Sequence, residues 1–353
     1  METNDTNASV RTLSLKPVSR PIRMGIDVGS TTVKVVILDD GGEIIYGVYE
    51  RHRADIRNTI ISVVNKAFDS LVSKFPLGEE QPVSVKVTGS GGLSVSEWLG
   101  IPFIQEVIAA TTVVKKVIPQ TDVVIELGGE DAKITYFKGG VEQRMNGTCA
   151  GGTGAFIDQM AALLETDAGG LNELAKGAAT IYPIAARCGV FAKTDIQPLI
   201  NEGARREDIA ASIFQSIVTQ TVSGLACGKP IRGHVAFLGG PLHFLDQLRK
   251  RFVVTLNLTP EETIVPENSQ LFVAAGAAYS AEREISCLSA EMQQKVHFPT
   301  IAEFRQSLTK LVDAEMQEVQ RLEPLFKDQA ELDEFNARHA TQVALKGDLA
   351  SAK

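Results

Sequence analysis

The amino-acid sequence predicts an α/β fold built from two related lobes, followed by a helical extension. One pattern occurs twice in the chain: residues 25–32 read GIDVGSTT and residues 124–131 read VIELGGED. In each copy an apolar strand carries one acid and one further apolar residue and then ends at a glycine. Such self-similarity indicates a duplicated unit, and 353 residues are enough for two well-buried lobes.

The first copy predicts a small sheet with a helix beside it. Apolar patterns predict strands at residues 24–28, 33–39 and 43–49, with a glycine turn between the last two. Residues 54–75 have the apolar spacing of an amphipathic helix. Residues 83–87 read as another buried strand, so the first lobe is predicted to contain four strands.

The second copy repeats this order. Strands are predicted at residues 123–127 and 132–137, and a third after the turn at Gly139 and Gly140. The sequence that follows is rich in predicted helix, up to a last strand at residues 234–238. Residues 269–281 are mostly small and predict a helix that packs closely across the lobe interface.

These patterns give the expected division of the chain. It comprises a disordered leader (1–22), a first lobe (23–120), a second lobe with two cysteine motifs (121–268), a helix returning to the first lobe (269–287) and a helical extension or linker (288–353).

Composition excludes several classes of protein. A formal net charge of −8 argues against nucleic acid as the main partner, because phosphate backbones require clustered Lys and Arg. The sequence has no apolar stretch long enough to span a membrane, and its first residues lack the apolar core of a secretory signal. Four cysteines are too few for a disulfide framework in a chain of this length. We therefore expect a cytoplasmic protein with reduced thiols.

The turn after the first strand has the composition of a phosphate site. Its glycine permits close approach of a ligand, and successive amides and hydroxyls can surround phosphate oxygens. The acid at the strand end is placed to hold hydrated Mg²⁺. A hairpin can also end in Gly-Ser-Thr without any ligand. The candidate residues are Asp27, Gly29, Ser30, Thr31, Thr32 and Lys34.

The corresponding turn of the second copy, ELGGEDAK at residues 126–133, adds two glycines and three carboxylates. Carboxylates repel phosphate unless a divalent cation lies between them, and Glu130 or Asp131 is a candidate to orient an attacking water. A single charged turn is usually only solvated, but two facing turns would hold a triphosphate between them. The candidates here are Gly128, Gly129, Glu130, Asp131 and Lys133.

A third glycine turn follows the last strand. Gly239 and Gly240 would let an adenosine pack on the backbone, although a glycine pair also commonly ends a strand. The run of small residues at 274–279 is more simply explained by packing between the lobes.

Two of the four cysteines lie in unusual surroundings. Cys149 is in a glycine-rich turn just before a predicted helix at residues 154–164, and Cys188 repeats the arrangement beside an arginine. A helix N-terminus stabilises negative charge and favours a thiolate ligand. A [4Fe–4S] cluster usually takes four thiolates, which a twofold homodimer would supply. Both residues could instead be ordinary buried cysteines. Cys227 is expected on an apolar helix face in the core, and Cys287 is expected to be incidental.

These motifs carry a resemblance to known families. From about residue 23 to 281 the order of elements resembles the acetate and sugar kinase, Hsc70 and actin superfamily, which implies actin-like, ribonuclease H-like lobes that bind ATP or ADP with Mg²⁺. The stretches NGTCAGGTGAF (146–156) and CGVFAKTD (188–195) resemble the 2-hydroxyacyl-CoA dehydratase activators and the BadF/BadG/BcrA/BcrD ATPase family. The extension after Cys287 looks like that of the first module in long fused members.

The resemblance implies a mechanism and partners. Such activators are homodimers with one [4Fe–4S] cluster at the interface, reduced by ferredoxin or flavodoxin, and ATP hydrolysis drives the electron onto an acyl-CoA dehydratase-type iron–sulfur enzyme. In this sequence Cys149 and Cys188 would be the cluster ligands. The turn formed by Gly151, Gly152 and Thr153 would join the cofactor-binding residues.

Two other functions remain open on the sequence. The same fold phosphorylates sugars and carboxylates, and Asp131 could serve as the base of such a kinase, but the two cysteine motifs would then be unexplained. The chain could also be a binding module in which ATP acts only as a conformational signal for a protein partner.

Overall fold

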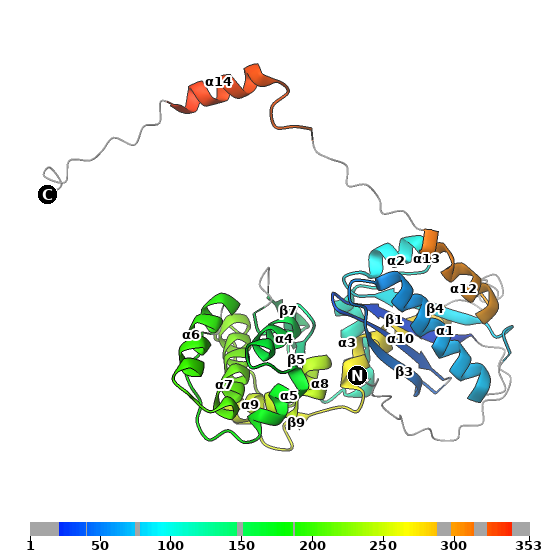
Figure 1. The fold of residues 1–353 in the computed structure, drawn as a ribbon. Coiled ribbons are helices and arrows are strands. Elements are labelled where there is room, and N and C mark those ends of the chain that lie inside the picture. Colours follow the sequence, from blue (N-terminus) through cyan, green and yellow to red (C-terminus); the bar gives the residue numbers. More distant parts are fainter. Residues whose placement is uncertain are drawn as a thin grey trace, which may run out of the picture. The chain divides into compact units, whose positions relative to one another are not determined.

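The computed structural model describes residues 21–39, 41–74, 78–146, 151–185, 188–287, 298–313 and 323–340. The expected leader therefore lies almost wholly outside the described residues. The chain forms two compact units, one ending at Asp313 and one beginning at Ala314. The larger unit contains two separate sheets with their helices (Figure 1). No helix in the described part of the chain is both long and apolar enough to cross a membrane.

The first sheet has the strand order β3-β2-β1-β4. Strands β1, β2 and β3 form an antiparallel meander, and β4 lies parallel to β1. The amphipathic helix α1 (Ile56–Lys74) buries its apolar face against one side of this sheet, as its spacing predicts. The strand bounds are Ile22–Val28 (β1), Thr32–Leu38 (β2), Ile44–Arg51 (β3) and Val83–Thr88 (β4), and α2 (Gly92–Leu99) follows.

The second sheet repeats this order as β7-β6-β5-β8, with the short β9 added at its edge. Again the first three strands form an antiparallel meander and the fourth, β8, is parallel to the first, β5. The structure thus confirms the duplication predicted from the two similar turns. The strands are Val123–Leu127 (β5), Ala132–Tyr136 (β6), Glu142–Met145 (β7), Val235–Leu238 (β8) and Thr263–Ile264 (β9).

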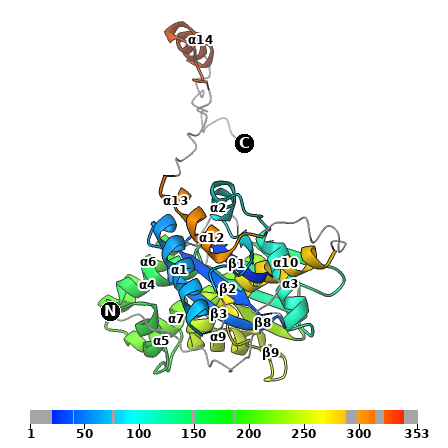
Figure 2. The same ribbon diagram turned by 90° about the vertical axis from the view of Figure 1, so that its right-hand side faces the viewer.

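Helices of the second lobe pack on this sheet and enclose its main core. Figure 1 shows them around β5 and β7 in green, and Figure 2 shows the same unit from the side. They are α4 (Gly154–Leu163), α5 (Ala168–Ala175), α6 (Gly189–Asn201), α7 (Arg206–Thr219), the π-helical η1 (Gln220–Leu225), α8 (Gly240–Phe244) and α9 (Asp246–Leu256).

Two helices join the sheets. The helix α3 (Glu106–Val117) and the small-residue helix α10 (Phe272–Cys287), which follows the 3₁₀ turn η2 (Ser269–Leu271), share a core with residues of β2, β5 and β8. A Cβ at Gly25 would overlap the carbonyl oxygen of Ala274, and one at Gly276 would overlap that of Ala109. The small residues therefore serve close backbone packing, as the sequence indicates.

The described part of the C-terminal region begins as a component of the first lobe. Ile301, Phe304 and Leu308 of α12 (Ile301–Leu308) are at most 1% exposed and belong to the core beneath α1. A capping box at Thr300 and Glu303 fixes the start of this helix. The short α13 (Lys310–Asp313) follows it.

In the second unit, α14 (Gln329–Ala340) has no buried residue. There the rings of Phe326 and Phe335 pack against each other at a tilt, with centroids 5.2 Å apart.

The expectation for Cys227 is wrong. The residue is exposed and follows η1, where the helix has already widened from α to π geometry. Its φ of 46° places it in the left-handed region, so the apolar helix face predicted from the sequence ends before it. The Sγ atom donates to the Gly224 carbonyl oxygen at 3.0 Å.

Candidate nucleotide site and cysteine motifs

The two sheets present an acid and a lysine at equivalent positions. Asp27 of β1 pairs in register with Lys34 of β2, and Glu126 of β5 pairs with Lys133 of β6. Side chains alternate between the faces of a strand. Gly25, two residues before Asp27, lies against α10, and Val124, two residues before Glu126, belongs to the core shared with α3 and α10. Both acid–lysine pairs therefore face the layer between the sheets and not the outer cores.

In the first lobe this pair is a direct ion pair. Lys34 Nζ lies 2.8 Å from Asp27 Oδ2, and both side chains are largely buried. Burial lowers the pKa of Lys34, but attraction to Asp27 together with smaller contributions from neighbouring acidic groups outweighs burial and raises the pKa of the lysine. A Cβ at Gly89, where φ is +91°, would crowd Asp27 and the Val28 carbonyl, so this glycine leaves room for the carboxylate at the strand end.

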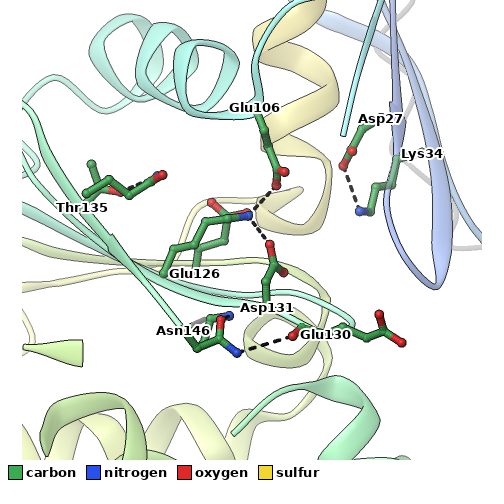
Figure 3. A network of polar contacts seen from close by, with 11 residues as sticks. Asp27, Lys34, Glu106, Glu126, Glu130, Asp131, Thr135 and Asn146 are labelled. Atoms are coloured by element: carbon green, nitrogen blue, oxygen red, sulfur yellow. Dashed lines mark hydrogen bonds and ion pairs between the residues drawn. The ribbon is translucent and has the colours of Figure 1, made fainter. Parts of the chain in front are cut away.

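One lysine of the second sheet lies among three carboxylates, one of which comes from α3 (Figure 3). Lys133 Nζ lies 2.5 Å from Asp131 Oδ2, 2.6 Å from Glu106 Oε1 and 3.6 Å from Glu126 Oε1. Despite burial, the three negative neighbours raise the pKa of Lys133 far above its usual value. Burial also raises the pKa of Glu106 to about 7, against the attraction of Lys133, and raises that of Glu126.

The two glycine turns meet. In the first, the Gly29 amide donates to the Thr32 carbonyl at 2.9 Å, and in the second, the Gly128 amide donates to the Asp131 carbonyl at 2.8 Å. A Cβ on Gly129 would overlap the Thr31 side chain. The absence of a side chain at Gly129 is therefore what permits this approach of the two turns.

The second turn is also bonded to the start of α4. The amides of Gly154 and Ala155 donate to the carbonyls of Gly128 and Gly129 at 3.0 and 2.7 Å. On the other side of the turn, the Ala132 amide donates to the side-chain oxygen of Asn146 at 2.7 Å. The turn is thus held between β7 and the helix that follows the first cysteine motif.

The third glycine turn adjoins the second. Gly239 has φ +90°, and a Cβ there would overlap the Leu127 carbonyl at the end of β5. A Cβ on Gly240 would overlap the hydroxyl of Tyr49 from β3. The ring of Tyr49 packs edge-on against Phe244, with centroids 5.4 Å apart. All three predicted turns therefore lie at the strand ends that face the opposite sheet.

Of the first cysteine motif, Cys149 itself lies outside the described residues. Gly151, Gly152 and Thr153 are buried directly before α4, and Thr153 is the N-cap residue of that helix. Gly152 has φ +85° and packs against Gln220 of η1. The predicted helix after this motif is confirmed.

Cys188 is the N-cap residue of α6 and is half-buried. The next residue, Gly189, packs against Phe156 and Gln159 of α4, at 3.6 Å from where its Cβ would stand. The start of α6 therefore adjoins the helix that follows Cys149. Beyond it, Val190 and Phe191 are 70% and 64% exposed.

Two residues that contact the predicted ones were not foreseen from the sequence. Glu106 is the first residue of α3 and reaches Lys133, and Tyr49 near the end of β3 contacts the third turn. Neither belongs to a glycine motif. No helix was predicted at the position of α3, and an acid at the start of a helix is in any case a common and unspecific feature.

Two related α/β lobes with facing glycine turns, acid–lysine pairs at equal register and a helix packed between them define the class of actin-like ATPases. The sequence matches the BadF/BadG/BcrA/BcrD ATPase family over residues 24–281. This match covers well over half of the chain, and the chain belongs to that family.

Individual relatives agree with this assignment. The chain is 31% identical to the 2-hydroxyisocaproyl-CoA dehydratase activator of Clostridioides difficile, over 73% of this chain and 94% of the relative. It is 30% identical to the activator of lactoyl-CoA dehydratase of Anaerotignum propionicum, over 73% and 96%.

Solved structures give the same result. The Acidaminococcus fermentans (R)-2-hydroxyglutaryl-CoA dehydratase component A superposes with a TM-score of 0.65 at 27% identity, covering 75% of this chain and 99% of that one. The Clostridium difficile activator of 2-hydroxyisocaproyl-CoA dehydratase, with bound ADPNP, also gives 0.65, at 29% identity, covering 79% and 99%.

Proposed function

We propose that this ATPase is an activator that uses ATP to deliver a low-potential electron to an iron–sulfur enzyme such as a 2-hydroxyacyl-CoA dehydratase. The electron would come from a [4Fe–4S] cluster shared by two copies of the chain. One observation carries the proposal: in an ATPase related to dehydratase activators, Cys188 begins a helix whose start packs on the helix after Cys149. A kinase would leave both cysteine motifs unexplained.

The residues present fit a magnesium nucleotide. At Gly129, Gly239 and Gly240 the backbone lies too close to neighbouring protein atoms for any side chain, so the three turns present bare backbone at the facing strand ends. Asp27 would hold Mg²⁺ through water, since Mg²⁺ usually keeps several waters beside one or two carboxylates. Gly29, Ser30, Thr31, Thr32 and Lys34 would bind phosphate from one side and Gly128, Gly129 and Lys133 from the other, while Gly239 and Gly240 would pack on the adenosine.

Two carboxylates are candidate catalytic groups for ATP hydrolysis, and their surroundings differ. Asp131 is held by Lys133 through the 2.5 Å ion pair, so its role would be to keep the lysine oriented toward the phosphates. Glu130, the neighbouring residue, has an exposed side chain. We assign Glu130 the orientation of the attacking water, a task that requires an acceptor not already engaged by a cation.

The cysteine chemistry fits a cluster shared by two chains. Cys188 offers a half-buried thiol at a helix N-terminus, which favours a thiolate ligand. Among the described residues, no three His, Cys, Asp or Glu side chains are arranged to hold a metal ion. One chain would contribute Cys149 and Cys188, and a twofold partner would complete the four thiolates. Bound there, the cluster supplies the low-potential electron.

The remaining components follow from this role. A ferredoxin or flavodoxin would be the electron donor, and the setting would be the reducing cytoplasm. Since α4 is bonded to the second turn through Gly154 and Ala155, nucleotide-dependent movement of that turn would be transmitted to the cysteine motif that precedes α4. ATP must bind one arrangement of the lobes better than the other for this to occur.

A pair of cysteine variants tests the proposal. Cys188→Ser should abolish ATP-dependent electron delivery to a 2-hydroxyacyl-CoA dehydratase. It should keep ATP hydrolysis, because Cys188 is assigned to the cluster and is not one of the residues proposed to bind phosphate. Cys227→Ser is the matched control, since Cys227 is an exposed cysteine of the same lobe, and it should leave both activities unchanged. Undiminished electron delivery from the Cys188→Ser protein would refute the proposal.

A further inference from the structure

An exposed ion pair links the two lobes beside the facing turns. Arg51, the last residue of β3, donates from Nη1 to Asp158 Oδ2 at 2.8 Å and from Nη2 to Asp158 Oδ1 at 3.3 Å. Asp158 belongs to α4 of the second lobe. The pairing is bidentate, the geometry in which an arginine–carboxylate contact is most directional.

Arg51 is joined to the first phosphate turn. It stands opposite Thr32 in the register of β2 and β3. The next residue, His52, donates its amide to the Thr31 carbonyl at 3.2 Å, and its Nε2 lies 3.2 Å from the Gly29 carbonyl oxygen. A displacement of the turn at residues 29–32 would therefore displace the end of β3 with it.

Asp158 is joined to the second turn and to the cysteine motif. It lies about one helical turn beyond the amides of Gly154 and Ala155, which are bonded to the second turn. Its neighbours Phe156 and Ile157 are buried in the second core, while the Asp158 side chain is 41% exposed and points out of that core to Arg51. The helix thus carries an anchored inner face and an outward carboxylate.

We infer that Arg51 and Asp158 are positioning residues that couple the apposition of the two phosphate turns to the placement of α4. When the turns are together, as here, the pair is formed; when the lobes separate, it must break. Only the role of this coupling rests on the proposed function: it would make the position of the cysteine motif depend on the bound nucleotide. The coupling itself requires neither iron nor a partner enzyme.

The size of the effect follows from the exposure of the pair. Arg51 and Asp158 are 56% and 41% exposed, and exposed pairs are screened by water and salt. We therefore expect a change of about fivefold in the equilibrium between the two lobe arrangements. An effect of this size is too small for loss of the pair to unfold the protein, but it is large enough to be measured.

The experiment measures hydrogen–deuterium exchange of α4 in the full chain, with and without Mg²⁺ and a non-hydrolysable ATP analogue. In the wild type the nucleotide should slow exchange in α4. In Arg51→Glu and in the milder Asp158→Asn, this slowing should fall about fivefold while α5 and α9 exchange as in the wild type. The double variant Arg51→Glu, Asp158→Arg should restore it, which a merely structural role for either residue would not produce.

Lys176→Glu is the matched control, because Lys176 and Glu173 form another exposed ion pair of the second lobe, within one helix. Its α4 response should equal that of the wild type. Wild-type behaviour of both single variants, or no recovery in the double variant, would overturn the inference. Because the readout needs no cluster, a protein that bound no iron would refute the proposed function and leave this coupling independently testable.

Discussion

The two lobes place an acid and a lysine at the same register positions but surround them differently. In the first lobe Lys34 serves one carboxylate, Asp27. In the second, Lys133 serves Glu126, Asp131 and Glu106, the last of these from the connecting helix α3. The two sheets thus share one framework, whereas the lysine of the second sheet faces an excess of negative charge. Under the proposed function, both lobes would bind phosphate and Asp27 of the first lobe would hold Mg²⁺ through water, while the additional acids of the second lobe would serve the attacking water.

The largest expected effect is the loss of Lys133. Lys133→Met would leave three carboxylates around a buried position with no cation, which we expect to cost about 4 kcal/mol of unfolding free energy. Lys34→Met leaves only Asp27 unpaired and should cost about 2 kcal/mol. Urea denaturation of both variants measures the difference. Equal losses of unfolding free energy in the two variants would mean that the additional acids around Lys133 do not increase its contribution to stability.

The next effect concerns the approach of the two turns. Gly129→Ala would place a methyl group on the Thr31 side chain, and the turns would have to separate. A displacement of this size at a reacting centre commonly lowers turnover by about 100-fold, so we expect a loss of that order in the rate of ATP hydrolysis.

Gly169→Ala serves as the control for that variant, because Gly169 is an exposed glycine of α5. It should hydrolyse ATP at the wild-type rate. Wild-type turnover by Gly129→Ala would show that the turns need not touch.

The smallest effect is a dependence of stability on pH. Glu106 has a pKa near 7 in the folded protein against an ordinary value of 4.5. Between these values the folded chain binds more protons than the unfolded chain, so this residue makes stability fall as pH rises, and the effect ends above about pH 7. Glu106→Gln lacks the titration.

The unfolding free energy of the wild type relative to Glu106→Gln should therefore decrease by roughly 1–2 kcal/mol from about pH 4.5 to about pH 7.5. Denaturation at several pH values checks this. A constant difference between the two proteins would place the titration elsewhere.

Much of the fold was predictable because its signals are local. The strands around Asp27 and Glu126 have short apolar runs ended by glycine, and their resemblance to each other predicted the repeated sheet order found in the structure. The small residues of α10 were predictable as packing residues for the same reason, since close helix contacts require them whatever the partner.

The parts that escaped prediction depend on distant residues. Glu106 acquires its surroundings only when α3 is set against β6, and the Arg51–Asp158 pair only when β3 meets α4. Cys227 was placed in the core because its neighbours are apolar, but the π-helical turn before it rotates the chain and exposes it. Helical periodicity fails where the helix itself changes pitch.

The structure brings the three turns to facing strand ends and Cys188 to the start of α6 beside α4. Cys149 lies outside the described residues.

The most direct measurement is iron and acid-labile sulfide per protomer after anaerobic purification, with the ultraviolet–visible spectrum. We predict about two irons per protomer and a broad absorption near roughly 400 nm, as expected for one [4Fe–4S] cluster held by two chains. No iron after anaerobic reconstitution would contradict the account. Cys149 and Cys188 would then be structural, and assays of phosphoryl transfer to small molecules would take precedence.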